Sequence, residues 1–91
     1  MAADQDKINQ VFSEWGNVYF SQGEKDGIRT EHGEEVLTAV LAVYRTLMDA
    51  GMGPQGMDES LRLFAVAARQ YPWLSDNARG KLLHAFVMNW K

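Results

Sequence analysis

The stretch EEVLTAVLAVYRTLMDA, residues 34–50, carries the clearest helical pattern of the chain. Its apolar residues recur at the three- and four-residue spacing of one helical face, and they are Val36, Leu37, Val40, Leu41, Val43, Tyr44, Leu47 and Met48. Such a stripe is wide enough to contact two neighbouring elements. Glu34 and Glu35 fall in the first turn, where the helix dipole favours acidic side chains. The pattern therefore predicts a helix over 34–50.

Downstream, the run AGMGPQGMDE, residues 50–59, is expected to end this helix. Gly51 is placed as a C-terminal cap, and Pro54 prevents the helix from continuing. Asp58 then resembles the N-cap of a third helix over 58–70, whose apolar face carries Leu61, Phe64, Ala67, Ala68 and Tyr71.

A fourth helix is expected over 76–90. Pro72 separates it from the third, because the residue before a proline avoids the helical region. Ser75 is a favourable N-cap residue, and one side of the segment is apolar, with Leu82, Leu83, Phe86, Val87 and Trp90.

Upstream, residues 4–20 predict the first helix, which Asp4 or Asp6 can cap. Its helical stripe consists of Ile8, Val11, Phe12, Trp15, Val18 and Tyr19. The segment SQGEKDGIRTEHG, residues 21–33, holds three glycines and mixed charges, which is typical of a polar loop. It is long for a connection in a compact helical domain, so we expect this loop to be either functional or mobile.

These patterns predict one all-α domain over residues 1–91, a compact four-helix domain arranged as a small bundle or an orthogonal array. The chain has 91 residues, of which 46% are hydrophobic, so a packed core is expected rather than disorder.

Composition narrows the classes of function. The chain has no cysteine, which excludes a disulfide, a thiolate nucleophile and a zinc–thiolate site. No signal peptide is visible at the N-terminus, and no segment reaches the roughly 18 apolar residues of a membrane span. We therefore expect a cytoplasmic protein that does not contact membranes.

Charge is unevenly distributed along the chain. Residues 1–50 hold nine of the twelve acidic residues but four of the nine lysines and arginines. The first half is therefore acidic and the second half slightly basic. Such asymmetry can steer a partner toward one side, or it can be a solvated surface without a binding role.

No catalytic motif is recognisable in the polar residues, and no cofactor is expected. His32 and Glu35 are three residues apart, which is the minimum for an acid–base couple or a metal site. A closed metal site needs three or four ligands, so an enzyme or metal protein centred on this pair is the weakest hypothesis. His84 falls on the polar side of its helix, where solvent exposure is expected.

A helix-turn-helix is an alternative function for the segment 75–81. The first turns of its second helix would offer Asn77, Arg79 and Lys81, and such side chains can contact bases. Against this, the chain carries a net charge of −3, whereas binding to nucleic acid needs a concentrated positive surface. Arg79 also precedes Leu82 and Leu83 by three and four residues, which places it toward the buried side, where it could pair with Asp76.

The leading hypothesis is a non-catalytic protein–protein interaction module, acting as an adaptor, an immunity protein or a phage-type inhibitor. Most of the ten aromatic residues are expected in the core, but Phe20, Trp73 and Trp90 lie outside the helical stripes or near ends. Together with acidic residues of the long loop, they form the expected partner-binding surface: Phe20, Glu24, Asp26, Glu31, Trp73 and Trp90. Excess apolar surface could also be buried in a homodimer, and we keep both the monomer and the dimer open.

Overall fold

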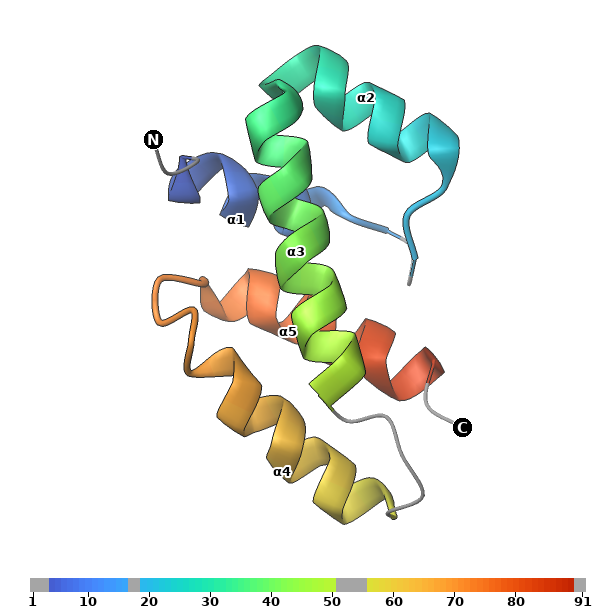
Figure 1. Cartoon of the computed structure of the whole chain (residues 1–91), viewed down its shortest axis with the longest axis vertical. Coiled ribbons are helices and arrows are strands. Elements are labelled where there is room, and N and C mark those ends of the chain that lie inside the picture. Colours follow the sequence, from blue (N-terminus) through green and yellow to red (C-terminus); the bar gives the residue numbers. More distant parts are fainter. Residues whose placement is uncertain (1–3, 17–18, 51–55, 90–91) are drawn as a thin grey trace.

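The computed structural model describes residues 4–16, 19–50 and 56–89, and these contain five α-helices and no β-strand (Figure 1). The helices are α1 (Gln5–Glu14), α2 (Gln22–His32), α3 (Glu34–Ala50), α4 (Met57–Ala68) and α5 (Asp76–Asn89). The prediction of a compact all-α fold is confirmed, whereas the number of helices is five rather than four. The Cα radius of gyration is 12.9 Å, close to the roughly 12 Å expected for a compact chain of this length.

Helix α3 is the central element of the fold, and its bounds agree with the prediction. It packs against each of the other four helices. In Figure 1, α1 and α5 cross α3 rather than run along it, as in an orthogonal array. Its inward face meets buried side chains of α1, α4 and α5 in one hydrophobic cluster. The largest fully buried apolar side chains of the core are Phe12, Val40, Leu47, Leu82 and Phe86, each contributing about 1.5–3 kcal/mol by burial.

Helix α2 occupies the segment predicted to be a loop, and that prediction is wrong. The backbone N–H of Glu24 donates to Ser21 Oγ at 3.2 Å, while the N–H of Ser21 donates to Glu24 Oε1 at 3.4 Å, which forms a capping box. Gly33 ends the helix with φ of 100°, in a region that favours glycine. No residue of α2 is buried, so the apolar stripe that reveals the other helices is missing here.

Helix α1 is shorter than predicted. It begins as expected, since Asp4 Oδ1 accepts from the N–H of Asp6 at 2.9 Å. It ends at Glu14 because Trp15 adopts an extended backbone, and the indole N–H of Trp15 then donates to the carbonyl of Tyr19 at 3.2 Å. The predicted helix over 4–20 is therefore wrong beyond Glu14.

Helix α4 begins at Met57 after Gly56, which supplies no side-chain cap. Asp58 lies inside the first turn, so its assignment as the N-cap is wrong. An acidic residue in the first turn is favoured by the helix dipole in any case. The expected cap Gly51 and breaker Pro54 lie outside the described residues.

The connection from α4 to α5, residues 69–75, is held in place by α1. The side-chain amide of Asn9 donates to the carbonyl of Trp73 at 3.0 Å, and Asn9 Oδ1 accepts from the N–H of Ser75 at 2.9 Å. Ser75 Oγ accepts from the N–H of Ala78 at 3.1 Å, so its predicted role as the cap of α5 is confirmed. None of the helices described is long and apolar enough to cross a bilayer.

Candidate functional site

A cleft of about 220 Å³ lies between α1, the segment after it, and α2. We call it the α1–α2 cleft. Helix α2 contributes Glu24, Gly27, Ile28 and Glu31, which are spaced three or four residues apart and so share one face. The cleft is lined by Val11, Glu14, Trp15, Phe20, Glu24, Gly27, Ile28, Glu31 and His32.

Aromatic rings form the floor of the cleft. The rings of Trp15 and Phe20 stack in parallel with their centroids 4.6 Å apart. Tyr44 of α3 meets both rings edge-on, at 5.5 Å from Trp15 and 5.3 Å from Phe20. Phe20 was expected to be an exposed aromatic, but it is partly buried and packs against the core. It contributes to the cleft as part of this aromatic cluster.

Three carboxylates surround this floor, and among the described residues no lysine or arginine lines it. Glu14 is the last residue of α1, and Glu31 lies in the last turn of α2. The negative end of a helix dipole makes a carboxylate unfavourable at both positions. Glu24 belongs to the capping box, so its position has a structural explanation that those of Glu14 and Glu31 lack.

His32 lies beside these acids at the end of α2. Its Nε2 is 3.8 Å from Glu31 Oε1, and its side chain is 8% exposed. Glu35, the partner proposed from the sequence, is an exposed residue of the first turn of α3. Among the residues that the structure describes, no three His, Asp or Glu side chains gather as a group that could hold a metal ion.

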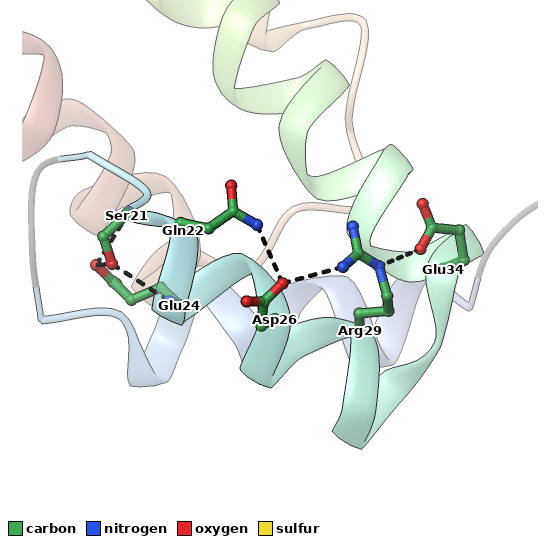
Figure 2. Close-up of polar contacts among 6 residues, drawn as sticks. All are labelled: Ser21, Gln22, Glu24, Asp26, Arg29 and Glu34. Carbon is green, nitrogen blue, oxygen red and sulfur yellow. Dashed lines mark hydrogen bonds and ion pairs between the residues drawn. The ribbon is translucent and has the colours of Figure 1, made fainter.

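Asp26 is absent from the cleft lining, and Figure 2 shows its side chain between those of Gln22 and Arg29. Asp26 Oδ1 accepts from the side-chain amide of Gln22 at 3.0 Å and from Arg29 at 3.0 Å. Arg29 also donates to Glu34 of α3, and this hydrogen bond, followed by the charge of Glu34, raises the pKa of Arg29. Of the three predicted acids, the fold therefore brings Glu24 and Glu31 to the cleft but places Asp26 in a polar chain that joins α2 to α3.

Of the two predicted tryptophans, the structure describes Trp73, which does not join this site. Trp73 lies in the connection before α5, edge-on to Tyr71 at a centroid distance of 5.8 Å, and it is absent from the cleft lining. Trp90 lies outside the described residues.

The residues of the helix-turn-helix alternative lie at the start of α5. Asn77 is exposed, and Lys81 is half-buried. Arg79 turns back toward its own helix start, with one guanidinium nitrogen 3.4 Å from the carbonyl oxygen of Leu74 and another 4.0 Å from Asp76. The expected proximity of Arg79 to Asp76 is thus present. The connection over 69–75 is longer than the three- or four-residue turn of that motif.

Glu14 and Ile28 of the cleft lining are not among the predicted partner-binding residues, and the sequence singles out His32 only as part of an acid–base couple or metal site. The sequence does contain a signal, because Glu14 and Glu31 lie at the C-terminal ends of helices. This signal can be used only after residues 22–32 are recognised as a helix. The motif Ser21-Gln22-Gly23-Glu24 has the spacing of a capping box and marks that start.

The chain matches no protein-family model, no curated protein and no solved structure. The chemistry of the cleft follows from its lining, with acidic oxygens around an apolar, aromatic floor. Such a surface can hold a basic side chain, because an apolar stem can lie on the floor while the charged head meets the carboxylates.

Proposed function

We propose that the protein is a non-catalytic protein–protein interaction module that binds a basic segment of its partner in the α1–α2 cleft. The observation that carries the proposal is the position of Glu14 and Glu31. Each carboxylate lies at the C-terminal end of a helix, where it costs stability. Both nevertheless line the same aromatic-floored cleft, which is the arrangement expected where a binding role outweighs that cost.

The architecture of α2 supports the same proposal. The helix contributes no buried residue to the core. Its start and end depend on Ser21 and Gly33 rather than on an apolar face. A helix that contributes so little to the interior acts mainly by forming a surface, in this case one wall of the cleft.

The partner's binding segment would present a lysine or arginine next to an apolar residue. The apolar stem would lie against Phe20 and Ile28, and the charged head would lie among the carboxylates. The negative charge would also speed association with a basic partner, since long-range charge acts mainly on the on-rate. An adaptor, an immunity protein and a phage-type inhibitor would each use such a surface in the same way.

The test is capture of partners from the source cell by the tagged protein, carried out with and without nuclease treatment. The decisive variant is Glu14→Gln/Glu31→Gln, which removes two negative charges from the cleft. Its matched control is Asp49→Asn/Asp58→Asn, which removes two charges from exposed positions on α3 and α4. Glu24 is left unchanged because its substitution would also remove a helix cap.

We expect the wild type and the control variant to capture the same proteins, and the Glu14→Gln/Glu31→Gln variant to lose them. Equal capture by both variants would contradict the proposed surface. Loss of all captured material on nuclease treatment would favour the helix-turn-helix alternative, whose DNA affinity must also fall steeply with salt.

A further inference from the structure

A second, larger hollow of about 620 Å³ lies between α4 and α5, on residues that the proposed interaction does not use. We call it the α4–α5 groove. The two helices diverge from the connection over 69–75 (Figure 1). Their contact includes the rings of Phe64 and Phe86, whose centroids are 5.1 Å apart. The groove is lined by Leu61, Phe64, Ala65, Ala68, Arg69, Pro72, Arg79 and Leu83.

The long walls of this groove are apolar. On α4, Leu61, Ala65 and Ala68 follow the spacing of one helical face. Leu83 lines the α5 side and is 39% exposed, and Val87, one turn further along α5, is 42% exposed. Large apolar side chains left this accessible beside a hollow indicate a surface that binds an apolar ligand.

Two arginines provide the charged groups of the groove lining, and both lie toward its connection end. Arg69 follows the last residue of α4, where its backbone N–H donates to the carbonyl of Val66, but its side chain makes no hydrogen bond or ion pair with the other described residues. Arg79 lies in the first turn of α5, where the helix dipole disfavours a cation. Its Nε atom is buried and has no hydrogen-bond acceptor among the described residues, which leaves a buried donor unsatisfied.

We infer that the α4–α5 groove binds an elongated apolar monocarboxylate, of the medium-chain fatty acid class. The carboxylate lies between Arg69 and Arg79, and the chain runs along Leu61, Phe64 and Leu83. Guanidinium groups are suited to this role because their donors match the two oxygens of a carboxylate. The volume also falls within the roughly 300–1,000 Å³ of small-molecule sites.

The length of the groove indicates the length of the ligand. Leu61 and Arg69 are separated by about 12 Å along the α4 axis, at roughly 1.5 Å per residue. An extended chain of about ten carbons spans this distance at ordinary bond lengths. Decanoate is therefore the probe. Each methylene removed from it leaves part of the groove unfilled and should weaken binding about fourfold.

Binding is measured by titrating the isotopically labelled protein with decanoate and following backbone amide shifts. We expect the largest shifts at Ala65, Ala68 and Leu83, with octanoate, which is two methylenes shorter, binding about fifteenfold more weakly. Decyltrimethylammonium has the same chain with the opposite charge, and it should bind more weakly than octanoate.

Two arginine variants and one control complete the test. Arg69→Gln removes one charge at an exposed position, and Arg79→Lys keeps the charge but removes the guanidinium geometry. Each should weaken decanoate binding about tenfold or more, because hydrogen bonds to charged groups are the strong ones. Arg45→Gln, at an exposed position of α3 outside the groove lining, should leave binding unchanged.

Any one of four results would overturn the inference. These are no saturable shifts at millimolar decanoate, equal binding of decyltrimethylammonium, shifts centred on the α1–α2 cleft, and unchanged affinity in Arg69→Gln. Each leaves the proposed protein-binding function intact, because that function rests on different residues.

Discussion

Helices α2 and α3 follow one another across Gly33 but are stabilised in opposite ways. Helix α3 buries six side chains and packs against every other helix. Helix α2 has no residue that is buried as a whole, although the side chain of His32 at its end is 8% exposed. It is held by its capping box, by Gly33 and by the Arg29 contacts to Asp26 and Glu34. One helix therefore builds the core, whereas the other forms a surface. The difference shows that a helix without an apolar stripe can be specified mainly by the capping residues at its two ends.

The largest expected difference between the two helices concerns side-chain truncation. Leu47→Ala in α3 should lower the free energy of unfolding by about 2–5 kcal/mol, because Leu47 is completely buried. Ile28→Ala in α2 should cost at most about 1 kcal/mol, since Ile28 is only partly buried. Urea unfolding of both variants measures the two values. Similar costs would mean that α2 belongs to the core after all.

The next largest effect concerns Gly27, which lies inside α2, and Gly33, which follows its last residue. Gly33→Ala should lower stability by about 1–3 kcal/mol, because alanine is strained at the positive φ of this residue. Gly27→Ala should instead raise stability by up to about 1 kcal/mol, since Gly27 lies inside the helix with no atom within 4 Å of an added Cβ. Thermal unfolding of this pair separates backbone strain from packing. Destabilisation by Gly27→Ala would contradict the helical assignment of the segment.

The same contrast explains what could be predicted from the sequence. Of the four helices that form the core, α3, α4 and α5 are predicted within two residues at each end, because burial imposes a helical period on their apolar residues. The segment of helix α2 is predicted as a loop for two reasons. Gly23 and Gly27 suggest that a helix would be interrupted there, and the segment has no apolar stripe that would indicate a helix. For the candidate site, charge alone led to the prediction of Glu24 and Glu31. Their separation from Asp26 could not be predicted without the helix that places them on different faces.

A smaller effect is expected for the acids of the cleft. Glu14→Gln/Glu31→Gln should leave the free energy of unfolding unchanged or raise it by about 0.3–1 kcal/mol per site at low salt, because it removes carboxylates from the negative ends of two dipoles. The gain should shrink as salt is added. Thermal unfolding at low and moderate salt measures it. A clear loss of stability would show that these acids serve the fold rather than binding.

The smallest effect is confined to alkaline pH. Burial raises the pKa of Tyr44 above its ordinary value near 10. The contribution of Tyr44 to stability is therefore fully present below about pH 10 and is lost as pH rises through the folded-state pKa. Tyr44→Phe should show a shallower fall of stability above about pH 10 than the wild type, as measured by urea unfolding across this pH range. Identical slopes for wild type and Tyr44→Phe would contradict the burial of this ring.

Native-state hydrogen exchange tests most directly the claim that α2 forms a surface while α3 forms the core. The amides of α2 should exchange through local opening at a lower free energy than those of α3, because few buried contacts must break to open α2. The amides of α3 around Val40 and Leu47 should exchange only near the global free energy of unfolding. Equal free energies of opening for α2 and α3 would contradict the account, because α2 would then unfold only together with the core.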